Sequence, residues 1–222
     1  TLFIKEIHGA KQFKIPKASA AGFTGDSKFL TASVNYSSII IVNLENNKTS
    51  ELDSFAFRGF TKDESYLIAR KQAATGMDLA VRNLFNGKNS FLFGVLEYST
   101  NPFKNEIALI ENNEGKSVVQ MLNLETGNYN LIKQSNTHTY KDITWSEDGN
   151  YITFYELPKD DIKGQSKIYS CQGTDCKYKD VSSLNNIDNF QMDYGLSEIS
   201  QLGKVVLFEG IPDTLRTDSK IP

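Results

Sequence analysis

The sequence has little of the residues that hold very small proteins together. Its 222 residues include only two cysteines, so a disulfide-dense miniprotein is excluded, and a chain of this length can bury a core without such staples. Long apolar runs are lacking as well. The longest, Ile39–Val42 and Val205–Phe208, fall far short of the roughly 20 residues that span a bilayer, so no membrane span is predicted.

An excess of charge of one sign is also missing. Lysine and arginine number 24 against 27 aspartates and glutamates, a net charge of −3, so a nucleic-acid-binding surface is not expected. With 23% charged residues, the composition fits an ordinary globular domain and excludes a disordered tail or a collagen repeat. No window of about eleven residues shows the helical period, so we expect almost no helix, at most one turn over residues 182–189.

The two ends of the sequence suggest a longer parent. Residues 1–7 are typical of a strand and follow no initiator methionine, and the last residues form a polar stretch without a terminal element. We therefore expect the chain to be a piece of a longer protein. Any signal peptide would lie upstream, so its absence here says nothing about targeting.

A repeat of 40 residues organises the chain. The pair Asn-Leu recurs at residues 43–44, 83–84 and 123–124, each time after a β-rich run and before turn residues. Turn residues such as Asn-Gly and Thr-Gly supply the positive φ values that tight hairpins need. Each Asn-Leu pair therefore predicts a hairpin.

A second motif predicts another hairpin in most repeats. It consists of an aromatic residue, Ser or Thr, any residue and Asp, followed by a strand, and it occurs at residues 22–30, 59–67 and 144–152. The Asp can accept hydrogen bonds from turn amides two residues on. Glu64 is an exception, because the other two copies have a small residue at that position. Degenerate copies run from Tyr98 to Leu109 and from Ile199 to Phe208.

Two hairpins per repeat give four short strands, which form one blade of a β-propeller. The predicted fold class is therefore all-β, a β-propeller of four-stranded antiparallel blades, with four whole blades and two half blades. The whole blades are expected at about 17–52, 53–94, 95–134 and 135–182, and the half blades at 1–16 and 183–222. The half blades could pair into a fifth blade, or remain open edges if the parent has further blades.

The segment from Trp145 to Phe154 resembles the Tol-type propeller repeat. It is similar to the units of the N-terminal propeller of the prolyl oligopeptidase and dipeptidyl peptidase class of serine peptidases, and the similarity covers nearly the whole chain. The order of three segments, 13–16, 21–29 and 204–212, resembles the large secreted members of this class from Bacteroidetes-type bacteria. The resemblance implies a periplasmic or secreted protein.

In that class the resemblance implies a separate C-terminal α/β-hydrolase domain, whose nucleophilic serine lies in a Gly-x-Ser-x-Gly motif. Four segments of this chain begin the motif, but its closing glycine is replaced by Phe29, Val119, Ile168 and Ile199. No catalytic residue is therefore predicted. The dipeptidyl branch also reads the substrate with two glutamates on a helical insertion. No such insertion is predicted here, so Glu156 and Glu209 are assigned no such role.

The histidines are assigned no catalytic or metal-binding role, and most aromatic residues are assigned to packing. His8 and His138 are the only histidines and are expected in exposed turns, without the serine and carboxylate contacts of a triad. The two histidines and two cysteines lack the short paired spacings of a zinc site, so no metal and no cofactor are predicted. Most aromatics are assigned to packing between blades, while Tyr36 and Tyr140 are candidates for stacking on a ligand.

Cys171 and Cys176 flank a predicted hairpin turn. Opposite positions on adjacent strands would place them within disulfide reach. The candidate disulfide would indicate an oxidising compartment, and two reduced cysteines on a hairpin are the alternative.

Three functions remain open. The first is a non-catalytic propeller that gates or orients peptide substrates for the C-terminal hydrolase domain of the same parent chain. Its expected contacts are the loops between second and third strands, at residues 34–38, 72–77, 111–116 and 157–165, the last of which is either a solvated loop or a contact with a partner domain. The second is a stand-alone Tol-type binding or scaffold propeller in the periplasm. The third, a glycan-processing propeller, needs inward carboxylates, whereas the inner strands are expected to present mostly Ile, Phe and Tyr.

Overall fold

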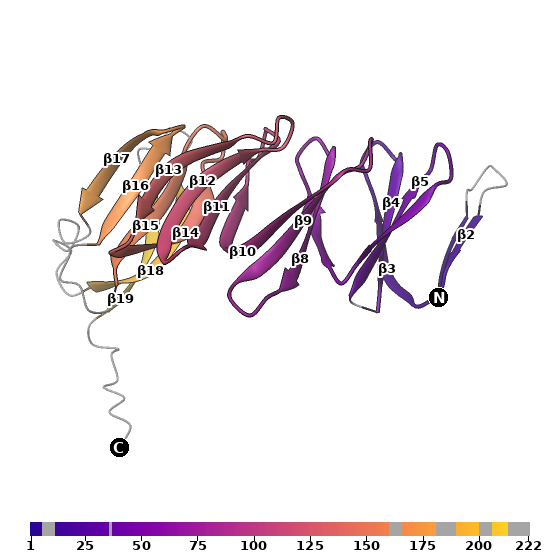
Figure 1. Ribbon diagram of the computed structural model, residues 1–222, viewed down its shortest axis with the longest axis horizontal. Coiled ribbons are helices and arrows are strands. Elements are labelled where there is room, and N and C mark those ends of the chain that lie inside the picture. The colour runs from indigo at the N-terminus through magenta and orange to yellow at the C-terminus, as the bar shows by residue number, and fades with distance from the viewer. Residues whose placement is uncertain (6–11, 36, 160–165, 181–189, 200–205, 213–222) are drawn as a thin grey trace, which may run out of the picture. The chain divides into compact units, whose positions relative to one another are not determined.

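The computed structural model describes residues 1–5, 12–35, 37–159, 166–180, 190–199 and 206–212 (Figure 1). These residues form strands and turns, and no helix occurs among them, so none of the described part could cross a membrane as a helix. The chain divides into two compact units, Thr1–Gly94 and Val95–Pro222. Each unit has its own buried core, and strand β10 is shared between them.

The first unit contains a hairpin followed by two antiparallel sheets. The hairpin consists of β1 (Leu2–Lys5) and β2 (Gln12–Ile15). The first sheet has the strands β3 (Ala18–Phe23), β4 (Phe29–Val34), β5 (Ser38–Asn43) and β6 (Thr49–Asp53), in that order. The second sheet has β7 (Ala56–Phe60), β8 (Tyr66–Gln72), β9 (Met77–Asn83) and the first half of β10 (Asn89–Thr100).

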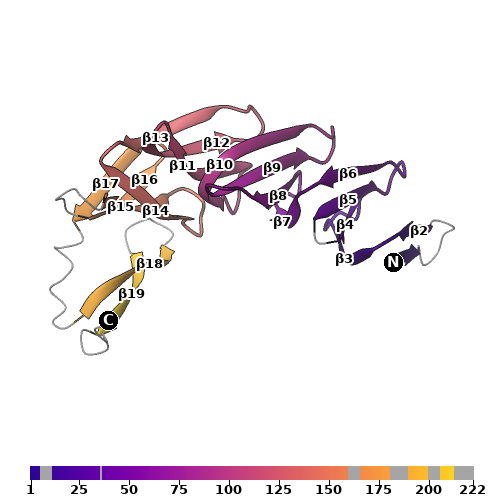
Figure 2. The ribbon, with the colours of Figure 1, turned by 60° about the horizontal axis from the view of Figure 1, so that its bottom comes forward.

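The second unit has the same plan in the opposite order, two sheets followed by a hairpin. Its first sheet has the second half of β10, β11 (Glu106–Asn113), β12 (Lys116–Asn123) and β13 (Tyr129–Ser135). Its second sheet has β14 (His138–Trp145), β15 (Ile152–Pro158), β16 (Lys167–Gln172) and β17 (Asp175–Asp180). The hairpin of β18 (Phe190–Ile199) and β19 (Val206–Pro212) lies beside β14 (Figure 2).

Strand β10 belongs to both units. Its residues up to Gly94 complete a sheet of the first unit, and its residues from Val95 pair with β11 in the second. Gly94 has a φ of +67°, a conformation that glycine adopts without strain. The expected boundary between residues 94 and 95 thus lies inside a strand rather than in a loop.

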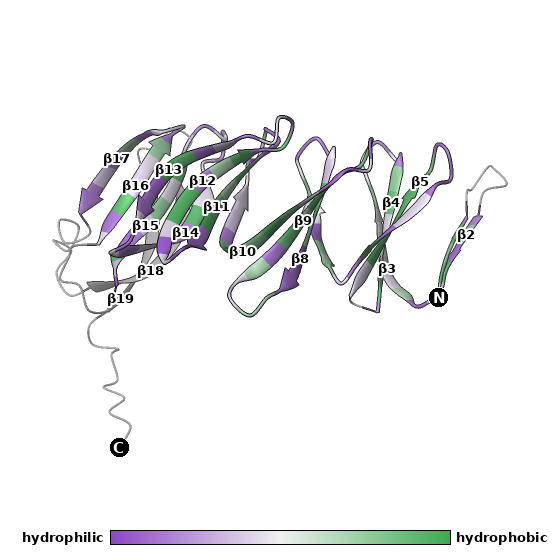
Figure 3. Cartoon of the chain, in the orientation of Figure 1, coloured by the Kyte–Doolittle hydropathy of each residue, from purple (hydrophilic) through white to green (hydrophobic). Residues whose placement is uncertain are grey.

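The middle strands of each sheet bury both of their faces, because successive side chains point to opposite sides. On β4 and β5, Phe29, Ile39 and Ile41 pack toward the second sheet, whereas Leu30, Ala32 and Val42 pack toward the hairpin β1–β2. Full burial of one such isoleucine contributes about 2 kcal/mol. Hydrophobic segments likewise line β11, β12 and β16 (Figure 3). Packing against a neighbour on each face is what a blade requires.

Side-chain hydrogen bonds hold the Asp turns of the repeat. Thr24 Oγ1 donates to Asp26 Oδ1 (2.7 Å) and accepts from the amide of Phe29 (3.1 Å). Asp26 Oδ1 also accepts from the amide of Lys28 (3.0 Å), and the same arrangement recurs at Thr61–Asp63 and Ser146–Asp148. The Thr24 hydroxyl is the main cause that lowers the pKa of Asp26, since it stabilises the charged carboxylate. The predicted turn chemistry is therefore present in the structure.

The Asn-Leu pairs close the other turn of each repeat. Oδ1 of Asn43, Asn83 and Asn123 accepts from the amides two and three residues on, at 2.9–3.2 Å. The amide of the following leucine donates to a carbonyl of the Asp turn or its counterpart, namely Lys28, Ser65 and Asn105, at 2.8–2.9 Å. Both turns of a repeat therefore lie at one end of the sheet and are bonded to each other.

The irregular residues of the repeat link neighbouring sheets at this end. The carboxylate of Glu64, the exception in the motif, accepts a hydrogen bond from the amide of Gly25 in the sheet before it. In the second unit, Asn101 Nδ2 donates to the carbonyl of Gly149 in the next sheet (2.9 Å). In each unit, a residue that departs from the repeat motif thus forms a hydrogen bond between neighbouring sheets.

Candidate functional site

The opposite end of the sheets carries the loops between second and third strands and the connections between sheets. In the second unit it includes the turn Glu114–Gly115, the connection Asn136–Thr137 and Lys159, which follows β15. We call these residues the loop end. It contains the described parts of two of the loops expected to contact a partner.

Lys159 ties the loop end together. Its ammonium donates to the carbonyls of Gly115 (2.8 Å) and Asn136 (2.9 Å), and its amide donates to the carbonyl of Thr137 (3.1 Å). One lysine therefore holds segments from two sheets in a fixed arrangement. The sequence placed it only in the loop 157–165, because its partners are main-chain carbonyls with no residue pattern of their own.

His138 begins β14 next to the loop end. Its Nδ1 lies 2.9 Å from Thr137 Oγ1, and its amide donates to Ser135 Oγ (3.0 Å). These bonds close a turn and include no carboxylate, so they do not form a catalytic triad. His8 and Tyr36 lie outside the described residues.

A buried carboxylate lies on β15, opposite Tyr140 of β14. Glu156 is 7% exposed and accepts from the hydroxyls of Tyr140 (3.3 Å) and Tyr169 (3.2 Å), and Lys167 Nζ is 3.5 Å away. Burial, and then the adjacent Glu156, raise the pKa of both tyrosines, which stay neutral donors at neutral pH. This network satisfies a buried charge and stiffens the sheet.

Tyr140, a candidate for stacking on a ligand in a loop, lies in the core instead. Tyr140 lies within β14, is 3% exposed, and packs edge-on against Phe154 with ring centroids 5.5 Å apart. Its side chain belongs to the core between two sheets, together with Ile143 and Tyr169. The polar run before Tyr140 suggested that this residue lies in a loop. The loop ends earlier, because β14 begins at His138.

The first strands of two sheets place two carboxylates, those of Glu97 and Asp142, close together. Glu97 on β10 accepts from the amide of Ile143 on β14 (3.3 Å), next to Asp142. Burial raises the pKa of both carboxyls, and the negative charge of Asp142 adds to the effect on Glu97. The expectation that these strands present mostly Ile, Phe and Tyr did not include this pair.

A β-bulge explains why the sequence concealed this pair. Asp142 has a φ of +55° and lies in a bulge where the register with β15 shifts between Lys141 and Thr144. The first strands β3, β7 and β10 have comparable shifts. A bulge interrupts the alternation of faces, so a two-residue pattern no longer tells which side chains point inward.

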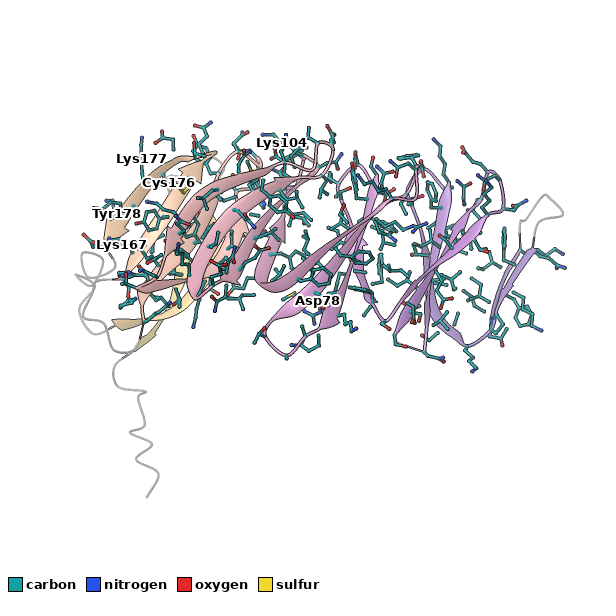
Figure 4. The ribbon with its side chains drawn as sticks, in the orientation of Figure 1. Asp78, Lys104, Lys167, Cys176, Lys177 and Tyr178 are labelled. Atoms are coloured by element: carbon teal, nitrogen blue, oxygen red, sulfur yellow. A yellow bond between two sulfur atoms is a disulfide. The ribbon has the colours of Figure 1, made fainter. Side chains whose placement is uncertain are left out.

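The two cysteines are paired directly across β16 and β17. Gly173 and Thr174 form a two-residue turn, Cys171 lies opposite Cys176, and their Sγ atoms are bonded. Cys171 is fully buried in the core of this unit, and Cys176 lies on the outer strand beside Lys177 and Tyr178 (Figure 4). The presence of this bond in protein from its native compartment remains a prediction.

Within the described residues, no three histidine, cysteine, aspartate or glutamate side chains gather closely enough to hold a metal ion. Glu97 accepts from a backbone amide, and Glu156 lies beside a tyrosine hydroxyl and the ammonium of Lys167. Among the described residues, these polar side chains form hydrogen bonds with one another and with the backbone. They do not place a nucleophilic side chain beside a general base in the manner of a catalytic triad.

Comparison with known proteins identifies the fold. No protein-family model matches the sequence, and no curated protein matches it. Dipeptidyl peptidase 4 of Porphyromonas gingivalis matches in structure with a TM-score of 0.58 and 11% identity, over 89% of this chain and 36% of that chain. Oligogalacturonate lyase from Vibrio parahaemolyticus matches with a TM-score of 0.54 and 12% identity, over 89% of this chain and 60% of that chain.

The chain is a β-propeller. At these identities the likeness shows the fold alone, and the propeller spans less than two thirds of either matched chain. The predicted all-β class with four-stranded antiparallel blades is confirmed. The number of blades in the parent and the closure of the half blades stay predictions.

Proposed function

We propose that this propeller is a non-catalytic part of a larger serine peptidase, in which it gates or orients peptide substrates for a C-terminal α/β-hydrolase domain. The proposal starts from the resemblance of the segment 145–154 to the propeller units of that class. It agrees with the absence of a Gly-x-Ser-x-Gly motif from the sequence, since the nucleophile would belong to the other domain. A fold likeness to a dipeptidyl peptidase of much greater length is compatible with it.

The observation that carries the proposal is the loop end fixed by Lys159. A surface that orients a peptide, or docks on a catalytic domain, must keep its shape while its partners change. Three ammonium and amide hydrogen bonds of 2.8–3.1 Å give this surface such rigidity across two blades. The disulfide between Cys171 and Cys176 is consistent with a periplasmic or secreted location.

A fluorophosphonate probe on the full-length parent tests the proposal. This reagent labels activated serines, so we expect labelling of the parent at a Gly-x-Ser-x-Gly serine downstream of Pro222 and no labelling of the 222-residue chain. An unreactive parent that lacks the motif would contradict the proposal. That result would favour the stand-alone Tol-type binding or scaffold propeller.

A further inference from the structure

The outer strands of the blades differ in how they protect their edges. Strand β6 carries Glu51 and Asp53, and β17 carries two lysines and two aspartates. The segment Asn89–Gly94 of β10 occupies the same place in its blade and has no charged residue. Charges on an edge strand normally prevent pairing with other chains, so this edge lacks the usual protection.

Two exposed phenylalanines occupy this segment. Phe91 is 45% exposed and Phe93 is 71% exposed, whereas Leu92 between them is buried on the other face. The Phe91 ring lies 5.8 Å from that of the buried Phe55 and stacks on Phe93 with centroids 6.5 Å apart. The aromatic column thus runs from the core of the first unit out into solvent.

The backbone of the segment also has an available edge. Among the strands that the structure describes, β10 has β9 and β11 as neighbours, and its pairs with β11 begin only at Val95. Asn89–Gly94 therefore pairs with β9 on one side and presents its other side to a further strand. An edge with exposed aromatic residues and no charge is suited to strand addition.

We propose that this edge pairs with the same edge of a second copy of the chain, in antiparallel fashion about a two-fold axis at Leu92. The sequence Phe91-Leu92-Phe93 is the same in both directions, so Phe91 of each copy lies opposite the partner's Phe93. The small Ser90 lies opposite the partner's Gly94. Aromatic pairs facing each other across strands stabilise a sheet, and a two-fold axis forms each of them twice.

Charge distinguishes this segment from the outer strand β6 of the other sheet in the first unit. Two copies of β6 paired in the same way would place Glu51 opposite the partner's Glu51, and like charges in that position destabilise a sheet. Self-pairing of Asn89–Gly94 meets no such repulsion. With two exposed phenylalanines per copy, the interface is small, so we expect a weak dimer with a dissociation constant of about 100 μM.

Sedimentation equilibrium of the 222-residue chain, from about 10 μM to 1 mM, tests the proposal. We expect a monomer–dimer equilibrium that the substitution Phe93→Lys weakens at least tenfold, because each copy then has a charge opposite an aromatic ring. Phe103→Lys is the matched control: Phe103 is 61% exposed but lies in a turn of the second unit, so its substitution leaves the equilibrium unchanged. Because both side chains are exposed, both variants should keep the native circular dichroism spectrum.

Hydrogen exchange gives a second measure that does not depend on a variant. The amides of residues 89–94 should become protected as the protein concentration rises, since a partner strand would bind part of them. A chain that stays monomeric at 1 mM, or a dimer that Phe93→Lys leaves intact, would overturn the proposal. The proposed dimer does not depend on the proposed peptidase function.

Discussion

Asn101 offers a strong test of how neighbouring blades are held together. It is 2% exposed and replaces the Ser/Thr-x-Asp pair of the regular repeat. Its Oδ1 accepts from the amides of Phe103 (2.9 Å) and Lys104 (3.0 Å), and its Nδ2 donates to the carbonyl of Gly149 (2.9 Å). One amide therefore shapes a turn in one blade and fastens it to the next.

The substitution Asn101→Ala removes these three hydrogen bonds and a longer one from Nδ2 to Glu106 Oε2 (3.3 Å), and it leaves the carbonyl of the buried Gly149 without this donor. At roughly 1 kcal/mol for each of the three bonds of 3.0 Å or less, we expect the free energy of unfolding to fall by about 3 kcal/mol. Urea denaturation followed by circular dichroism measures this change. Asn150→Ala is the control, because Asn150 is exposed and its side chain donates to Asp148 at the surface (2.9 Å), and we expect a loss below about 0.5 kcal/mol.

A second substitution separates the two halves of the Asn101 side chain. Asn101→Asp keeps both acceptor bonds but turns the donor into an oxygen facing the carbonyl of Gly149 and the carboxylate of Glu106. Protonation restores a donor, so this variant should lose less stability at pH 4 than at pH 7. A loss below about 1 kcal/mol for Asn101→Ala would refute the reasoning. So would an Asn101→Asp variant whose loss of stability is the same at pH 4 and pH 7.

Two further predictions concern the second unit. Mass spectrometry of non-reduced protein from its native compartment should find Cys171 bonded to Cys176, and the double serine variant should be about 2 kcal/mol less stable; two free thiols would contradict this. Glu97 has a pKa raised by burial, so its folded form favours the proton, and the stabilisation present at low pH is lost as pH rises through this pKa. Glu97→Gln should therefore flatten the change in melting temperature between pH 4 and pH 7, and an unchanged slope would show that Glu97 does not contribute.

Much of the fold could be predicted because its turns depend on local chemistry. The bonds of Asn43 to amides two and three residues on, and of Thr24 to Asp26, involve near neighbours in the sequence. The recurrence of the Asn-Leu pair every 40 residues, together with the three copies of the Asp motif, predicted the strands and the blade. The alternation of Ile39, Ile40 and Ile41 between two faces follows from the same strand geometry.

The contacts between blades could not be predicted in this way. Glu64 and Asn101 looked like irregularities, because their partners lie 39 and 48 residues away. Glu97 and Asp142 were missed because a bulge interrupts the face pattern. Lys159 binds carbonyls, which every residue possesses, so no sequence motif could reveal its role.

The two-faced middle strands have a consequence for how such a chain can change in length. Each of β4 and β5 contributes one set of side chains to the neighbour before it and another to the neighbour after it. A gene segment copied in units of one repeat adds a sheet whose two faces already match those on either side. An insertion of half that length would leave an unmatched apolar face, so duplication is tolerated only in whole repeats.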